Sequence, residues 1–302
     1  MIAKEDFCGI DCYTLSSDRL AVRIMTLGAT VIDLRFDGRP VLLNYATAQE
    51  YLRGDAYLGA IVGRYANRIA GARFCIGGKD FFLDRNEGDN QLHGGKDSFD
   101  RRNWKASLCG ENALRLTLFS PDGDNGYPGN LTASVTYTVS ENRLRIDFEG
   151  ESDADTVYAP TTHMYFNLGG SETILNAQLW INAKTYLPVD AALIPVGGPQ
   201  PAGGLYDFSQ GKPIAGNIDH CFPLEGHHAC TAADGGVEME LYTDYPALQL
   251  YTGEFLNGRK NGGFAIEPEF FPNSPNRPDF PSPLLHAGEH FHKYAEYRFR
   301  QV

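Results

Sequence analysis

The chain of 302 residues lacks a long apolar run and lacks any cluster of basic residues. No stretch approaches the roughly 20 apolar residues that cross a membrane, and the charged start at Lys4, Glu5 and Asp6 does not fit a secretory signal. The formal net charge of -12 disfavours a nucleic-acid partner, because such binding depends on clustered Lys and Arg. These absences predict a cytoplasmic protein whose partners are neither membrane nor nucleic acid.

The sequence also lacks the usual motifs for disulfides, metals and nucleotides. Its six cysteines form no C-x-x-C pair, and a chain of this size needs no covalent staples, so we expect reduced thiols. Neither group of clustered histidines has zinc-finger or H-E-x-x-H spacing, so we expect no metal. These groups are His220 to Cys230 and His286 to His292. No phosphate-binding loop, dinucleotide fingerprint or G-x-S-x-G elbow is present, which removes the sequence arguments for a nucleotide or a serine nucleophile.

Alternation of apolar residues with a period of two is the dominant pattern, and it predicts half-buried strands. The segments that show it are 20–24, 114–118, 131–139, 144–148, 237–241, 248–250 and 297–299. Helical periodicity is weak and favours only a short helix over 46–52. With 33 glycines and 17 prolines to form turns, the chain is predicted to be all-β, a large antiparallel sandwich in one domain over residues 1–302. The Pro/Gly-rich stretch Pro195 to Gly204 is expected to be a loop within it.

Several polar side chains occur where a strand pattern does not require them. His163 interrupts the uncharged run 161–168, whose β-branched and aromatic residues predict a strand, so a titratable group is expected on rigid structure. Glu267 follows an apolar strand, and Glu269 should lie on the same face about 7 Å further on. Each of these residues also has an ordinary explanation, a hydrogen-bonded core histidine or a strand-end charge.

Three further strings carry groups suited to binding a polar ligand. Asn67 and Arg68 place an amide beside a cation, which together donate several hydrogen bonds. His93 precedes paired glycines that allow the backbone to approach a ligand closely, and Asp219 lies in the string 217–222. Each string is weak evidence when it is taken alone.

Taken in order, seven strings resemble the aldose 1-epimerase (galactose mutarotase) family. They are GRYANRI at 63–69, LHGG at 92–95, SPDGDNGYP at 120–128, TTHMYFNL at 161–168, DHCF at 219–222, QLYTG at 249–253 and GFAIEPEFFP at 263–272. The resemblance runs from about Tyr13 to Arg300. It implies a β-sandwich of the mutarotase type that binds a small-molecule aldose in an open cleft, without a cofactor. The sequence leaves open whether the chain is a monomer or a homodimer.

The resemblance also implies roles for individual residues. Glu267 matches the catalytic base of the family and His163 its general acid. The positions that contact the substrate match Asn67, Arg68, His93, Asp219 and Gln249. The chain departs from the family pattern at four positions, where an aromatic, an asparagine, a glutamine and an aspartate are common. These departures bear on which sugar is preferred, and they are Ile218, Glu254, Glu269 and Asn273.

Elementary chemistry agrees with these roles. Interconversion of the anomers of a free hexose such as galactose or glucose requires removal of a proton from the C1 hydroxyl and protonation of the ring oxygen. A glutamate, with an ordinary pKa of about 4.3, is a base at neutral pH. We expect a nearby carboxylate to raise the pKa of His163 enough to keep it protonated.

Two other functions remain open from the sequence. A glycoside hydrolase needs two carboxylates about 5 to 9.5 Å apart, a role that Glu267 and Glu269 are able to fill. A carbohydrate-binding sandwich without catalysis needs only the polar cleft. Release of new reducing ends identifies the first, and sugar binding without faster mutarotation identifies the second.

Overall fold

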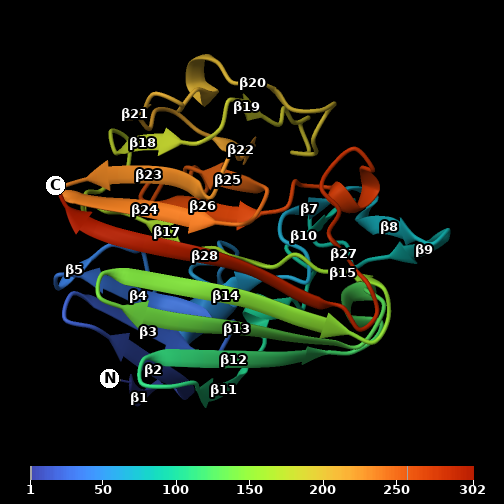
Figure 1. Cartoon of the computed structure of the whole chain (residues 1–302), viewed down its shortest axis with the longest axis horizontal. Helices are drawn as coiled ribbons and strands as arrows, with labels where there is room; N and C mark the ends of the chain where they lie inside the picture. The colour runs from blue at the N-terminus through green and yellow to red at the C-terminus, as the bar shows by residue number, and fades with distance from the viewer. Residues whose placement is uncertain (1, 257) are drawn as a thin grey trace.

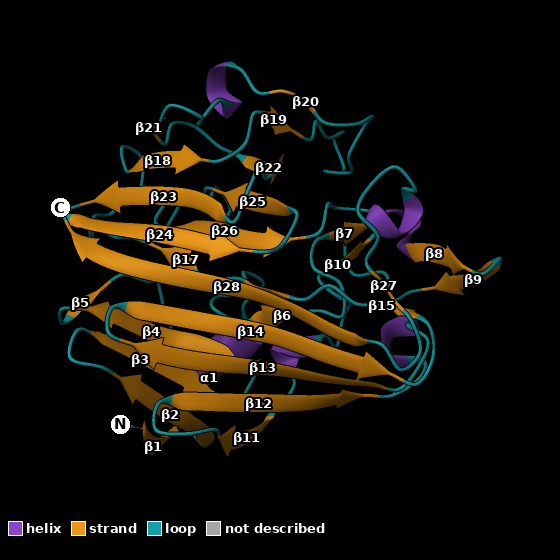
Figure 2. Cartoon of the chain, in the orientation of Figure 1, coloured by secondary structure: helices purple, strands orange, loops and turns teal. Residues whose placement is uncertain are grey.

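The computed structural model describes residues 2–256 and 258–302, and antiparallel strands dominate it (Figure 1, Figure 2). The largest sheet has nine strands and faces the viewer in Figure 1. Its strands, in spatial order, are β11 (Lys105–Leu108), β12 (Ala113–Ser120), β13 (Leu131–Ser140), β14 (Arg143–Ser152), β28 (His290–Gln301), β24 (Val237–Thr243), β23 (His228–Asp234), β18 (Gln178–Ile181) and β21 (Lys212–Pro213).

The predicted alternation explains how this sheet buries one face. Leu114, Tyr137, Ile146 and Ala295 lie opposite one another on β12, β13, β14 and β28, and each has an exposed fraction of 0%. Because successive side chains of a strand point to opposite faces, the residues between them lie toward solvent or are only partly covered. The strand predictions for 114–118, 131–139 and 144–148 are therefore confirmed.

Two smaller sheets form the layer behind the nine-stranded sheet (Figure 1). Phe36 in the first stacks on Phe299 of β28 at 5.8 Å between ring centroids, and Phe166 in the second lies 5.3 Å from Tyr297 of β28. The main core thus lies between the layers, as predicted for a sandwich. The first sheet is β1 (Ile2–Phe7), β2 (Ile10–Ser16), β3 (Leu20–Met25), β4 (Thr30–Phe36) and β5 (Arg39–Pro40), and the second is β17 (Tyr165–Phe166), β26 (Phe264–Glu269), β25 (Ala247–Tyr251) and β22 (Asp219–Pro223).

Short paired strands complete the fold. They are β6 (Ile61–Val62) with β16 (Thr161–Thr162), β7 (Arg68–Ile69) with β10 (Gln91–Leu92), β8 (Arg73–Ile76) with β9 (Lys79–Phe82), β15 (Thr156–Val157) with β27 (Leu284–Leu285), and β19 (Thr185–Tyr186) with β20 (Gln200–Pro201). The 3₁₀ turns of the described residues are Ala70–Ala72, Phe99–Arg101, Asp124–Gly126, Gly204–Tyr206 and Ser274–Asn276. The expectation that Pro195 to Gly204 is only a loop is wrong in one respect, because β20 lies within it and pairs with β19.

The short helix predicted over 46–52 is confirmed as α1 (Ala48–Arg53). It begins two residues later than predicted because Thr47 caps it. The Thr47 side chain accepts from the Glu50 backbone N–H, and the Glu50 carboxylate accepts from the Thr47 backbone N–H. Among the described helices, none has the length and apolar character needed to span a membrane.

The strand predicted over 161–168 is interrupted at His163. Thr161–Thr162 pairs with β6, whereas Tyr165–Phe166 pairs with β26, so the chain changes partner strands between them. The periodicity of a single segment does not reveal which strands it pairs with, which is why the break was not predicted. His163 thereby lies at a junction between sheets.

Candidate active site

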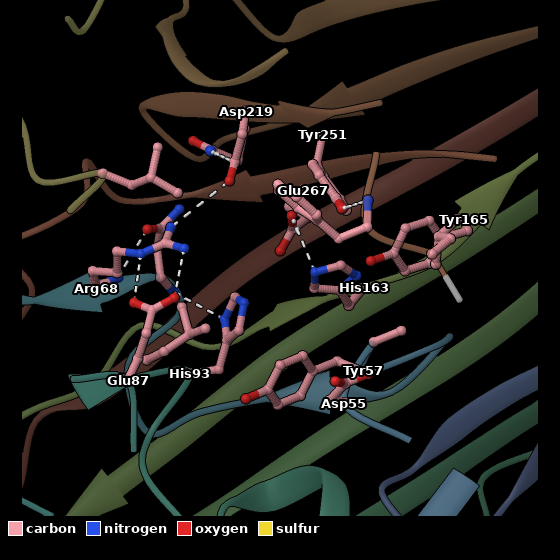
Figure 3. Close-up of a pocket in the computed structure, with 17 residues that line it drawn as sticks. Asp55, Tyr57, Arg68, Glu87, His93, His163, Tyr165, Asp219, Tyr251 and Glu267 are labelled. Carbon is pink, nitrogen blue, oxygen red and sulfur yellow. Dashed lines mark hydrogen bonds and ion pairs between the residues drawn. The ribbon is translucent and has the colours of Figure 1, made fainter. Parts of the chain in front are cut away.

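A cleft of about 290 Å³ opens beside this junction (Figure 3). Its walls contain every residue for which the sequence predicted a catalytic or substrate-binding role. These residues are Asn67, Arg68, His93, His163, Asp219, Gln249 and Glu267. The structure therefore brings together side chains that are up to 200 positions apart in the chain, between Asn67 and Glu267.

The four-stranded sheet supplies one wall. Gln249 on β25 lies directly opposite Glu267 on β26, and β25 is paired on its other side with β22, which begins at Asp219. The Gln249 amide donates a hydrogen bond of 2.5 Å to the Asp219 carboxylate. Three polar side chains are thus held on three adjacent strands, and the hydrogen-bonded sheet fixes their positions relative to one another.

Glu267 and His163 face each other in the cleft, with 3.5 Å between Oε1 and Nε2 (Figure 3). Their exposed fractions are 2% and 4%. The backbone of His163 is fixed on both sides, because its N–H donates to the Ala60 carbonyl and its carbonyl accepts from the Gly59 N–H. Tyr165 lies against the imidazole at 4.9 Å between ring centroids. A base and an acid are therefore available within reach of one substrate.

The expectation that a carboxylate keeps His163 protonated is wrong for the cleft as it stands. Burial lowers the pKa of His163 to about 4, and burial raises the pKa of Glu267 well above its ordinary value, with the charge of Asp219 adding to the rise. A dry site disfavours charge on either group, so the neutral acid and the neutral imidazole are the favoured pair. The sequence does not reveal how deeply a side chain is buried. Here the effect of burial on the two pKa values outweighs the attraction between Glu267 and His163.

Arg68 carries the positive charge of the cleft. Its guanidinium donates to both oxygens of Glu87, at 2.7 and 2.8 Å, and Nη1 lies 3.9 Å from the Asp219 carboxylate. Burial works to lower the pKa of Arg68, but Glu87 and Asp219 outweigh burial and the pKa is raised. Figure 3 places Arg68 and Glu87 on one side of the cleft and the pair of Glu267 and His163 on the other.

His93 is fixed by the backbone of Asn67. The Asn67 N–H donates to His93 Nδ1 at 3.1 Å, and the Asn67 carbonyl accepts from the His93 N–H. Both residues adopt left-handed conformations, with φ of 65° and 51°. Since Nδ1 accepts a hydrogen bond, Nε2 carries the proton of the neutral ring and His93 is a donor toward the cleft.

Several cleft residues were not identified from the sequence. Glu87 belongs to a polar turn, where a carboxylate is common and draws no attention. Nothing in the sequence around it indicates that it pairs with Arg68. Tyr57 lies 4.7 Å from the His93 ring and 5.9 Å from the His163 ring, and its φ of 52° is rare for an aromatic residue. Phe255 lines the cleft while 80% exposed. Among the other lining residues, Leu92, Tyr165 and Tyr251 lay within strings that had been singled out, although none of the three had been given a role.

One group in the described chain has the spacing to hold a metal ion, and it is not among the clusters weighed from the sequence. Ligand atoms of His93, His163 and Glu267 lie within 4.8 Å of one another. The chemistry of the set fits a metal poorly, because the hydrogen bond to Nδ1 of His93 leaves its other nitrogen protonated and unable to ligate.

The four departures from the family pattern do not line the cleft. Ile218 is 1% exposed, and Glu254 pairs with Lys260 at 3.6 Å. Asn273 accepts from the Ala70 N–H, and Glu269 lies behind the cleft wall with an exposed fraction of 0%. Any influence of these four residues on sugar preference is therefore indirect.

Comparison with known proteins identifies the family of the chain. The family model described as aldose 1-epimerase matches residues 11–298. The chain is 36% identical to galactose mutarotase of Homo sapiens, with 96% of this chain and 94% of that protein covered. It is 37% identical to aldose 1-epimerase of Escherichia coli (strain K12), with 93% and 92% covered.

Solved structures show the same fold. An aldose epimerase homologue from C. elegans matches with a TM-score of 0.92 and 28% identity, covering 99% of this chain and 100% of that one. Galactose 1-epimerase from Lactobacillus acidophilus matches with a TM-score of 0.89 and 30% identity, covering 100% and 98%. The β-sandwich is thus of the galactose mutarotase type, and this chain belongs to the aldose 1-epimerase family, whose members are isomerases.

Proposed function

We propose that the protein interconverts the α and β anomers of a free hexose such as galactose or glucose, with Glu267 as base and His163 as acid. The observation that carries the proposal is the 3.5 Å approach of these two side chains in a buried, polar cleft. Mutarotation needs one proton removed and one supplied within a single ring, which two facing groups do without a cofactor.

Ring opening follows from this geometry. Glu267 removes the proton of the C1 hydroxyl while His163 donates a proton to the ring oxygen, so the bond between C1 and that oxygen breaks and C1 becomes an aldehyde carbon. Rotation about the bond between C1 and C2 presents the other carbonyl face. The two groups then reverse their roles, since His163 takes the proton back from the attacking hydroxyl and Glu267 returns its proton to the carbonyl oxygen.

The ionisation of the pair is compatible with these steps. The reactive form, a carboxylate and an imidazolium, contains the same number of protons as the neutral pair that burial favours. The two forms differ only in the position of one proton between atoms 3.5 Å apart. Sugar hydroxyls that donate to Glu267 and accept from His163 stabilise the charged form, so substrate binding itself favours the reactive state.

The remaining predicted residues would hold the sugar. Arg68 and the Nε2–H of His93 donate to sugar oxygens, and Asp219 accepts from hydroxyl groups. Gln249 and Asn67 complete the wall, with one amide bonded to Asp219 and the other to Glu269. Donors and acceptors of both kinds match a neutral polyol better than a phosphate, because an anion offers only acceptors.

Polarimetry tests the proposal. Purified protein added to freshly dissolved α-D-galactose or α-D-glucose should accelerate the approach to equilibrium rotation and leave the final rotation unchanged, since a catalyst does not shift an anomeric ratio. Glu267→Gln is the matched inactive control. Relaxation no faster than in buffer, across a panel of aldoses, would overturn the proposal.

The rival functions receive less support from the site. Glu269 has no exposed surface and does not line the cleft, so it is unable to serve as the second carboxylate of a glycoside hydrolase beside Glu267. A pure binding function leaves the close contact of Glu267 with His163 without a purpose. The cytoplasmic location, the single domain over residues 1–302 and the choice between monomer and homodimer stay predictions.

A further inference from the structure

Glu269 is a buried carboxyl group that the proposed reaction does not use. It lies on β26 two positions after Glu267, and the strand alternation puts both on the same face. Glu267 reaches the cleft, whereas Glu269 ends behind the wall with an exposed fraction of 0%. Its Oε1 accepts a hydrogen bond of 3.0 Å from the Asn67 side-chain amide. Its Oε2 has no hydrogen-bond partner in the described chain.

The surroundings of Glu269 do not compensate a negative charge. No basic side chain of the described residues lies within ion-pair distance of Glu269. The charge of Arg68 works to lower the pKa of Glu269, but Arg68 is itself paired with Glu87. A second carboxyl, that of Glu267, belongs to the same strand. An ionised carboxylate is costly when it is buried with one neutral donor and no cation. The groups whose charge or ionisation couples to Glu269 are Glu267, Asp219, Cys221, Arg68, Tyr65 and Tyr245.

Asn67 connects Glu269 to the cleft. Its Nδ2 donates to Glu269, and its Oδ1 accepts from the backbone N–H of Arg68 at 2.8 Å. Its own backbone N–H donates to Nδ1 of His93. Asn67 is therefore a junction in a left-handed turn, with φ of 65°, and the bond to Glu269 is the one that anchors its side chain to the sheet.

We propose that Glu269 is a positioning residue, held as a neutral carboxylic acid, which fixes Asn67 and through it the tautomer of His93. As a neutral group it also leaves Glu267 as the one carboxyl of β26 that ionises during the reaction. Burial, followed by the charges of Glu267 and Asp219, raises the pKa of Glu269 well above its ordinary value, in agreement with this geometry. The catalytic consequence rests on the proposed function, but the protonation state does not.

Infrared spectroscopy at neutral pH reads the protonation state directly. The wild-type spectrum should contain the carbonyl stretch of a protonated carboxylic acid that is absent from Glu269→Gln and that shifts in D₂O. Glu111→Gln, which changes an exposed carboxylate, should leave this band intact. Identical spectra of wild type and Glu269→Gln in this region would overturn the proposal, whether or not the protein catalyses mutarotation.

Thermal stability as a function of pH gives a second test without substrate. A carboxyl whose pKa is raised by folding contributes stability that is complete below its unfolded pKa and is lost as the pH rises toward its folded pKa. Glu269→Gln has no such loss. The melting temperature of the variant, relative to that of wild type, should therefore increase as the pH rises from about 5 to 8. A difference that is constant over this range would mean that Glu269 is ionised in the folded protein, contrary to the proposal.

Kinetics then separate positioning from mere packing. Glu269→Gln keeps a neutral acceptor for Asn67, so kcat and KM at neutral pH should stay within about 3-fold of wild type. Glu269→Leu is neutral but offers no acceptor, so KM should rise about 10-fold with a smaller change in kcat. Equal kinetics of both variants would remove the positioning role. Absence of mutarotation in the wild type would instead refute the proposed function and leave the infrared and stability results to stand alone.

Discussion

Arg64 and Arg68 occupy the same seven-residue string, 63–69, yet they serve two different regions of the molecule. Arg64 lies behind the cleft, 2% exposed, and its guanidinium donates to four backbone carbonyls and two hydroxyl groups. The carbonyls belong to Ser120, Pro121, Pro128 and Gly129. Arg68 faces the cleft and is bonded to a carboxylate. Arg64 thus holds loops together, whereas Arg68 is the arginine for which we propose a role in sugar binding.

The pKa values of the two arginines are also shifted in opposite directions. Burial lowers the pKa of Arg64 to about 10, because none of its hydrogen-bond acceptors carries a full charge. The pKa of Arg68 is raised, because Glu87 and Asp219 overcome the effect of burial. A motif of charged residues therefore mixes structural and functional members, and only the position of each side chain relative to the cleft separates them.

The largest effect is expected in the cleft itself. Glu267→Gln keeps the shape and removes the base, and His163→Asn keeps a polar group and removes the acid. Each should lower kcat by 10²-fold to 10⁴-fold, about 3 to 5 kcal/mol of barrier, with a smaller change in KM. The double variant should be little worse than the poorer single variant, since the two groups act as one unit.

Stopped-flow polarimetry measures these rates, with Glu111→Gln as a surface control. Single variants that keep near-full kcat and show only a raised KM would mean that these residues bind sugar without catalysing its opening.

Substitution of Arg64, behind the cleft, should lower stability rather than activity. Arg64→Met leaves three buried carbonyls and one partly buried carbonyl without their donor, so the free energy of unfolding should fall by about 3 kcal/mol. The kcat of the folded protein should stay within a few-fold of wild type, because Arg64 does not line the cleft. Urea denaturation measures the first quantity, and Arg85→Met, at an exposed ion pair, is the control, with an expected change below about 0.5 kcal/mol. A large loss of kcat without loss of stability would erase the contrast between the two arginines.

A milder change is expected at Arg68. Arg68→Lys keeps the charge but loses the planar fork that grips both oxygens of Glu87, so the apparent binding of sugar should weaken by about 1 to 3 kcal/mol. KM for galactose and glucose measures this effect, and Arg85→Lys is the control. Unchanged kinetics would place the function of Arg68 outside sugar binding.

The division between these regions was only partly predictable. Alternation identified β12, β13 and β14 because a half-buried strand must repeat every second residue, whatever its partners are. The break at His163 depends on which strands pair with each half of the segment, and that information lies elsewhere in the chain. The seven predicted site residues meet in the cleft, but their strings say nothing of depth. Arg64 and Glu269 were therefore not distinguishable from their cleft neighbours, and the pKa of His163 was predicted in the wrong direction.

A pH profile of kcat/KM sharpens the comparison between exposed and buried titration. In the proposed mechanism, the pair of Glu267 and His163 is active when it contains one proton in total. Below the pKa of His163, about 4, a second proton enters and the base is lost, so activity falls on the acid side. As the pH rises through the raised pKa of Glu267 the shared proton leaves, so activity falls again.

His163→Asn should change this profile in a defined direction. Glu267 then titrates alone, and its residual activity as a base should appear only as the pH rises through its raised pKa. The acid limb should therefore move to higher pH, and the alkaline limb should disappear. An acid limb that stays at the wild-type position would mean that His163 does not set it.

The smallest effect is expected from removal of metals or from reduction. The hydrogen bond from the Asn67 N–H to Nδ1 leaves Nε2 of His93 protonated, so His163 and Glu267 are the two groups of the cleft cluster that are free to ligate. Two ligands from the protein fall short of the three that catalytic zinc sites use. All six cysteines are unpaired, so a reductant has no disulfide to break. Rates measured after dialysis against EDTA and in dithiothreitol should match untreated enzyme. If EDTA abolishes activity and added zinc restores it, then His93 adopts the other tautomer, and the hydrogen bond from Asn67 does not persist in the working enzyme.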